Sequence, residues 1–86
     1  MPEISRFLGV VIAMFYNDHA PPHCHARYGD LEIRVDITTG QVLSGSFPKN
    51  VESLVLEWVG LRRSELMINW ALAGKRKPLI KVAPLE

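Results

Sequence analysis

The chain has 86 residues, 48% hydrophobic and 22% charged, with a formal net charge of +1 at pH 7. This composition excludes a disordered chain, and the longest apolar stretch, residues 8–16, is too short to cross a bilayer. The size fits one domain, so we expect a single unit over residues 1–86. With one cysteine and no basic apolar leader, we expect a cytoplasmic protein.

Residues 5–45 predict a small antiparallel β-meander of three to four strands. The β-branched and aromatic run of residues 7–16 is typical of a strand covered on both faces. Residues 23–28 predict a short second strand, and the alternation over residues 31–37 predicts a third with one face in the core. A Thr-Thr-Gly sequence then predicts a hairpin into a short fourth strand at residues 41–43.

After Pro48 the hydrophobic period changes to about 3.6 residues, which predicts one helix over about residues 49–73. Gly60 costs about 1 kcal/mol relative to alanine in a helix, so we expect a break or kink near residues 60–64. The tail, residues 75–86, is expected to be extended, either as an edge strand or on a partner. The predicted fold is therefore α+β, a meander packed against one long or kinked C-terminal helix.

The chain is small enough that a partner subunit is expected. A domain of this size buries only about 60–65% of the surface its unfolded chain exposes, so oligomerisation adds useful stability. Trp58 and Trp70 are expected to anchor the helix in the core. In the alternative, Trp70 forms part of a subunit contact, since aromatic residues are enriched in interface cores.

One short segment gathers an aspartate, all three histidines and the only cysteine around a Pro-Pro pair. Its candidate site residues are Asp18, His19, His23 and His25. In an extended strand, His23 and His25 project to one face and Cys24 to the other. We expect the two residues before the Pro-Pro pair to fold back toward the histidine face, and we expect Cys24 to be a small buried hydrophobe.

These four side chains are compatible with three kinds of chemistry. As metal ligands, they supply nitrogen and oxygen donors suited to a divalent transition metal such as zinc, iron or manganese. As catalytic groups of a ribonuclease, the imidazoles serve as base and acid near neutral pH. The residues expected to bind the substrate are then Arg27, Arg34 and Tyr28. In the third interpretation, the histidines bond to backbone and Asp18 braces the turn.

A cupin is excluded, although His-x-His followed by Asp30 imitates a cupin metal motif. A cupin needs a complete double-sheet barrel, and about half of this chain is helix and tail.

Several motifs together resemble a known family. They are Asn17-Asp18-His19-x-Pro21-Pro22-His23-x-His25, Tyr28-Gly29, Asp36-Ile37 with Gly40, and Leu54 to Trp58 with Trp70. Over nearly its whole length, the chain is similar to small bacterial proteins known as the domain of unknown function 4160 family.

The resemblance implies a toxin-like component of a bacterial type II toxin–antitoxin pair. Its partner would be a cognate antitoxin-like protein, of the domain of unknown function 2442 type, encoded by the neighbouring gene. RNA is then a candidate substrate, and a homo- or hetero-oligomer without membrane contact is expected. The resemblance brings no catalytic residues with it. The alternative is a non-enzymatic regulatory or assembly subunit with a metal-binding or structural Asp/His turn.

Overall fold

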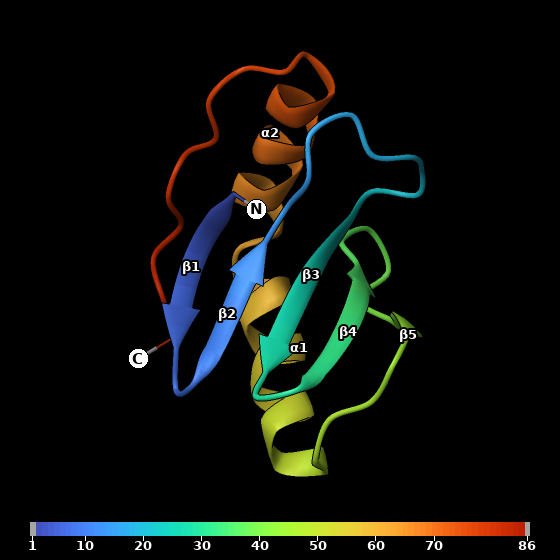
Figure 1. Cartoon of the computed structure of the whole chain (residues 1–86), viewed down its shortest axis with the longest axis vertical. Helices are drawn as coiled ribbons and strands as arrows, with labels where there is room; N and C mark the ends of the chain where they lie inside the picture. The colour runs from blue at the N-terminus through green and yellow to red at the C-terminus, as the bar shows by residue number, and fades with distance from the viewer. Residues whose placement is uncertain (1, 86) are drawn as a thin grey trace.

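The computed structural model describes residues 2–85 and consists of an antiparallel sheet and two helices (Figure 1). The sheet is a meander of five strands in chain order, β1 (Glu3–Phe7), β2 (Val10–Ala13), β3 (His23–Tyr28), β4 (Leu31–Asp36) and β5 (Val42–Ser44). The helices α1 (Lys49–Leu61) and α2 (Arg63–Gly74) both lie behind the sheet in Figure 1. The predicted α+β class is confirmed. No helix within residues 2–85 has both the length and the apolar character needed to span a membrane.

The N-terminal region forms two strands where the sequence predicts one. Leu8 and Gly9 have φ angles of 50° and 81°, the left-handed values of a two-residue type I′ turn, and Phe7 pairs with Val10. The expectation of three to four strands was therefore wrong. The turn is hidden within the apolar run because Leu8 is hydrophobic, although its side chain is 64% exposed.

The hairpin of β3 and β4 sets the register of the region that holds the candidate residues. Gly29 has a φ of 61°, and the turn pairs Tyr28 with Leu31. His25 consequently lies opposite Arg34. Residues directly opposite in an antiparallel pair share a face, so the polar side chains of both strands project on the same side.

The C-terminal half contains two helices, so the expectation of one helix over about residues 49–73 is wrong in this detail. Arg62, with φ −107° and ψ 18°, leaves the helical conformation between α1 and α2. The break lies within the predicted range of residues 60–64, two positions after Gly60. The Arg63 side chain donates from Nε to the carbonyl oxygen of Ile37 at 2.9 Å, which ties the start of α2 to the end of β4.

The core lies between the sheet and the helices. Trp58 of α1 is fully buried, packs on Phe7 at 5.3 Å between ring centroids, and donates from Nε1 to the carbonyl oxygen of Ala83 at 2.8 Å. The extended tail runs beside β1, where the backbone N–H of Val82 donates to the carbonyl oxygen of Ile4 at 2.8 Å (Figure 1). The predicted edge strand is thus an extended segment at this edge and is not itself a regular strand.

Candidate functional site

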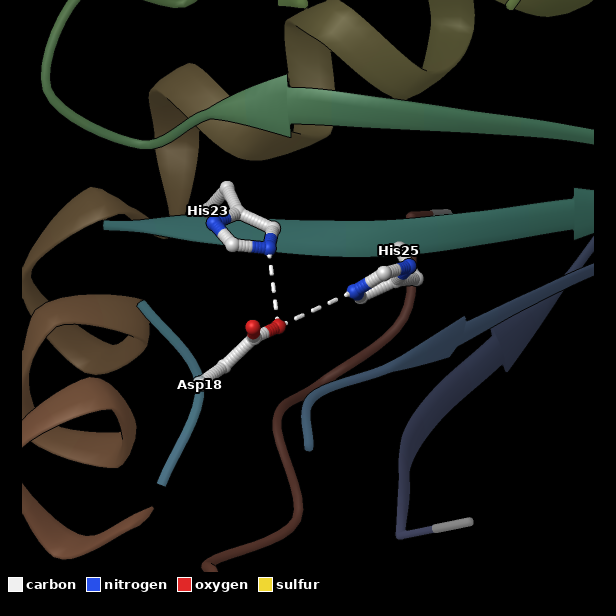
Figure 2. Close-up of side chains that lie close together, drawn as sticks. All are labelled: Asp18, His23 and His25. Carbon is white, nitrogen blue, oxygen red and sulfur yellow. Dashed lines mark hydrogen bonds and ion pairs between the residues drawn. The ribbon is translucent and has the colours of Figure 1, made fainter. Parts of the chain in front are cut away.

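Three of the predicted site residues converge on one point at the start of β3. Figure 2 shows Asp18, from the loop between β2 and β3, pointing at both His23 and His25. Asp18 Oδ2 lies 2.9 Å from His23 Nε2 and 3.4 Å from His25 Nε2. One donor atom from each of the three residues lies within 4.8 Å of the others.

Contacts with α2 and with its own backbone hold Asp18 in place. Asn17, with a left-handed φ of 54°, donates its backbone N–H to the carbonyl oxygen of Ala73 in the last turn of α2, at 3.0 Å. Asp18 Oδ1 accepts the backbone N–H of His19 at 2.9 Å. One carboxylate oxygen is thereby engaged with the loop, while Oδ2 faces the two imidazoles.

His23 is oriented by its other ring nitrogen. The side chain is 2% exposed, its ring packs on Trp70 at 5.3 Å between centroids, and its Nδ1 lies 2.7 Å from the carbonyl oxygen of Pro21. Since a carbonyl oxygen only accepts, Nδ1 carries a proton and donates it. In a neutral ring, Nε2 therefore presents its lone pair to Asp18.

His25 is oriented in the same way by a carboxylate. Its Nδ1 lies 3.1 Å from Glu32 Oε2, and the ring of Phe15 packs edge-on against it at 4.5 Å between centroids. A proton on Nδ1 satisfies Glu32, whereas a proton on Nε2 satisfies Asp18 at 3.4 Å, so a neutral ring donates to only one of the two carboxylates. Both imidazoles thus direct Nε2 at the same carboxylate oxygen.

When the His23 ring is neutral, two hydrogen-bond acceptors, His23 Nε2 and Asp18 Oδ2, face each other. Among residues 2–85, His23 Nε2 makes no hydrogen bond of acceptable geometry, although Asp18 Oδ2 is 2.9 Å away. A lone pair and a carboxylate oxygen repel at this distance unless a cation, either a proton or a metal ion, lies between them.

The pKa of Asp18 is shifted by its surroundings. Burial raises it, but the backbone N–H of His19, the hydrogen bond with His25 and, when those rings are protonated, the charges of His23 and His19 together lower it further. The net pKa lies below its usual value of 3.8, so Asp18 is a carboxylate at neutral pH.

The two Asp18–histidine separations are compatible with a mononuclear metal site. At zinc–ligand bonds of about 2.0–2.1 Å, neighbouring ligand atoms of a tetrahedral site are roughly 3.3 Å apart. The Asp18–histidine separations of 2.9 and 3.4 Å bracket this value. A histidine that binds a metal usually donates its other N–H to a carbonyl or a carboxylate, as the two imidazoles do with Pro21 and Glu32. Two histidines and one carboxylate suit zinc, iron(II) or manganese and leave coordination positions open.

His19 lies outside this group, although the sequence placed it with the other three. Its side chain is 80% exposed, and its Nδ1 lies 3.1 Å from Asp18 Oδ1, the oxygen that does not face His23 and His25. It therefore braces the carboxylate from the solvent side.

The residues predicted to bind a substrate are divided between the two faces of the sheet. Arg27 and Arg34 lie on the face of His25, where Arg27 pairs with Glu32 at 3.5 Å and Arg34 donates to Ser44 Oγ at 2.9 Å. Tyr28 lies on the opposite face, with its ring 5.9 Å from that of Phe47. The structure thus brings the two arginines near the site and separates Tyr28 from it.

Cys24 also lies on the opposite face, as strand alternation predicts. Its side chain is fully buried in the core, and burial raises the pKa of its thiol to about 12. The thiol stays protonated at neutral pH and does not join the site.

Three contacts of the site were not predicted: Glu32 and the rings of Phe15 and Trp70. Glu32 was detectable, because a tight turn at residues 29–30 makes it the diagonal cross-strand neighbour of His25 on the polar face. Phe15 lies in the loop between β2 and β3, and Trp70 lies in α2. No spacing in the sequence predicts that their rings contact the histidines.

Comparison with known families agrees with the resemblance in the sequence. The sequence model of the family described as "Domain of unknown function (DUF4160)" matches residues 9–71, a range that contains the whole Asp18, His23 and His25 group. No curated protein and no solved structure matches the chain significantly.

Proposed function

The chain belongs to the DUF4160 family, and we propose that it binds one divalent transition-metal ion through Asp18, His23 and His25. Zinc, iron(II) and manganese(II) are the ions that this donor set suits. When bound, such an ion supplies a Lewis acid with open coordination positions. The protein's own contribution is to hold the three donors and to fix the tautomers of both imidazoles.

The observation that carries the proposal is the orphaned Nε2 of His23. This atom is buried and has no hydrogen-bond partner among residues 2–85, and it faces a carboxylate oxygen at 2.9 Å. Buried polar atoms are nearly always satisfied, so an exception calls for a missing partner. A metal ion satisfies His23, His25 and Asp18 at once, because it accepts all three lone pairs.

The metal interpretation has more support than the ribonuclease interpretation. A catalytic acid or base has to reach the reacting oxygen within about 3 Å, and His23 is only 2% exposed. A purely structural turn explains the Nδ1 contacts of both imidazoles. It explains why both Nε2 atoms face one carboxylate oxygen only if each ring carries a second proton on Nε2, which makes both imidazoles cations.

The test is metal binding by protein purified without a histidine tag. We expect one equivalent of zinc or iron(II) by elemental analysis and by titration. Asp18→Asn, His23→Gln and His25→Gln are expected to lose it. His19→Gln is the matched control, because His19 is a neighbouring histidine that is not one of the three proposed ligands. Metal-free wild-type protein that takes up no ion, or equal losses in all four variants, refutes the proposal.

The toxin–antitoxin role stays a prediction that rests on the family resemblance. If it holds, the chain forms a stable complex with the antitoxin-like product of the neighbouring gene, and its expression alone arrests growth. Co-purification of the two proteins and growth curves test this. The Asp18→Asn variant would show whether arrest depends on the metal site. Normal growth with no complex contradicts the prediction.

A further inference from the structure

A small hollow lies between α2 and the C-terminal tail, and none of the proposed metal ligands lines it. Its volume is about 60 Å³, and its walls combine aliphatic side chains with one carboxylate and one ammonium group. The lining residues are Glu65, Ile68, Asn69, Ile80, Lys81 and Val82. The hollow is therefore separate from the three-donor site.

Hydrogen bonds fix the position of the tail beside α2. Asn69 of α2 is 1% exposed; its Nδ2 donates to the carbonyl oxygen of Ile80, and its Oδ1 accepts the backbone N–H of Ile80, both at 2.8 Å. Two residues further along, the backbone N–H of Val82 donates to the carbonyl oxygen of Ile4 at 2.8 Å, so the tail follows the edge of β1 (Figure 1). The hollow is thus preformed, and a partner that fills it does not have to order the tail first.

Apolar side chains also lie on the outer surface beside the hollow. Ile68 is 54% exposed and Ile80 is 59% exposed. Leu66 and Ala73 of α2 are buried in the core, so this helix carries apolar side chains on its outer side as well as on its inner side. Apolar residues all round a helix are typical of one that is covered on every side. The outer side of α2 therefore calls for a partner surface.

The hollow and the side chains beside it are complementary in size. One water needs roughly 10–15 Å³ of such space, so 60 Å³ holds a branched side chain of about four carbon atoms, such as that of isoleucine. Ile68 is more than half exposed at the rim. One surface thus provides both a hollow and a side chain that fits the same hollow in a second copy of the chain.

The charges at the hollow are complementary in the same sense. Glu65 lies on the helix wall and Lys81 on the tail wall. Among residues 2–85, Lys81 forms no ion pair and donates from Nζ to the carbonyl oxygen of Glu3, while Glu65 has one long contact, at 3.6 Å, with Arg62. In a two-fold arrangement, the carboxylate of each copy meets the ammonium group of the other, so the favourable pair occurs twice.

We infer that the outer side of α2 and the adjoining tail form the interface of a symmetric homodimer, in which Ile68 of each copy fills the hollow of the other. The symmetry follows because the hollow and the side chain that fills it belong to one self-complementary patch. The interface adds buried apolar area, of which a chain of 86 residues has little. Glu65 and Lys81 set the orientation of the two copies more than their affinity.

Sedimentation velocity of the full-length protein over about a hundredfold range of concentration tests this interface. We expect the wild type to form a concentration-dependent dimer and Ile68→Gln to weaken it at least about tenfold. The matched control is Leu31→Gln, which replaces an exposed apolar residue on β4 and is expected to dimerise as the wild type does. Melting curves check that both variants are folded. Asp18→Asn is expected to dimerise normally, because the hollow and the three-donor site share no residue.

Charge reversal gives a result that a folding defect cannot produce. Glu65→Lys and Lys81→Glu each place two like-charge pairs in the homodimer, and each is expected to weaken dimerisation about tenfold. In an equimolar mixture, the heterodimer of the two variants regains both opposite-charge pairs. We therefore expect the mixture to associate as strongly as the wild type.

Three results overturn the inference. The first is a wild type that stays monomeric at every concentration; if Ile68→Gln then weakens a complex with the product of the neighbouring gene, the face belongs to that partner and not to a second copy. The second is a dimer that Ile68→Gln leaves intact, which places the contact on another surface. The third is a mixture of the two charge-reversed variants that associates no more strongly than either variant alone.

Discussion

Glu32→Gln provides a quantitative test of the metal site, because this residue contacts a proposed ligand and not the ion. Glu32 Oε2 lies 3.1 Å from His25 Nδ1. A carboxylate in this position fixes the tautomer of the imidazole and makes it a better donor, and its loss typically weakens metal binding by about 10- to 100-fold. The Glu32 side chain is 42% exposed, so solvent screens its interaction with His25. We therefore expect Glu32→Gln to weaken metal binding by about tenfold, the lower end of that range.

The expected change in melting temperature follows from the size of the chain. At a free metal concentration about 100 times the dissociation constant, binding stabilises the native state by about 2.7 kcal/mol. A chain of 86 residues unfolds with an entropy of about 0.18 kcal/mol/K, so we expect metal binding to raise the melting temperature by about 15 °C. A tenfold weaker variant at the same metal concentration keeps about 1.4 kcal/mol, which corresponds to about 8 °C.

Differential scanning fluorimetry with zinc and with chelator measures this difference. Asp30→Asn is the matched control, since it removes one negative charge from the exposed turn of the same hairpin. We expect Asp30→Asn to keep the full metal-dependent rise. Equal rises for Glu32→Gln, Asp30→Asn and the wild type would refute the orienting role of Glu32. The absence of any rise in the wild type would refute the metal site.

Further changes have expected outcomes in the metal-free protein. Gly45→Ala is expected to lower the melting temperature by more than about 10 °C, because Gly45 has a φ of 82° and an added Cβ collides with the carbonyl of Glu32. Gly60→Ala, at the second-last residue of α1, is expected to raise it by up to about 5 °C, since it gains at most about 1 kcal/mol of helix propensity. The folded pKa of Asp18 lies below its usual 3.8, so its stabilising contribution is present above that pH and lost as pH falls through the folded value. Urea unfolding from about pH 5 to pH 2.5 should therefore show a shallower loss of stability for Asp18→Asn than for the wild type. Cys24, whose pKa is raised to about 12 by burial, should react with a thiol reagent at pH 8 only after unfolding.

The sequence predicts best where side-chain alternation and turn residues agree. In the β3–β4 hairpin, Leu31, Ile33 and Val35 alternate with charged residues, and Gly29 marks the turn, so both the strands and their shared polar face follow from the sequence. The β1–β2 hairpin lacks this contrast. Its exposed turn residue Leu8 is hydrophobic, and the run of apolar residues conceals the break.

The sequence predicts the part of the candidate site that lies on β3, but not which loop residue joins it. Alternation places His23 and His25 on one face, and they are found together with Asp18 (Figure 2). Alternation does not predict whether Asp18 or His19 faces these two histidines, because both lie in an irregular loop. That choice depends on the backbone bond from the loop to Ala73 in α2, a contact between distant parts of the chain.

The end of β4 connects the loop and the helix that together shape the site. Ile37, which is fully buried, donates its backbone N–H to the carbonyl oxygen of Pro22 at 3.0 Å, just before β3 begins. The carbonyl of the same residue accepts the side chain of Arg63 at 2.9 Å, at the start of α2. Because α2 restarts at this fixed point after the helix break, its last turns reach the loop, where Trp70 meets the His23 ring and Ala73 holds the backbone. The break therefore directs α2 onto the site. Both helices contribute buried residues to the core, and α2 also covers the end of the sheet that holds Asp18, His23 and His25.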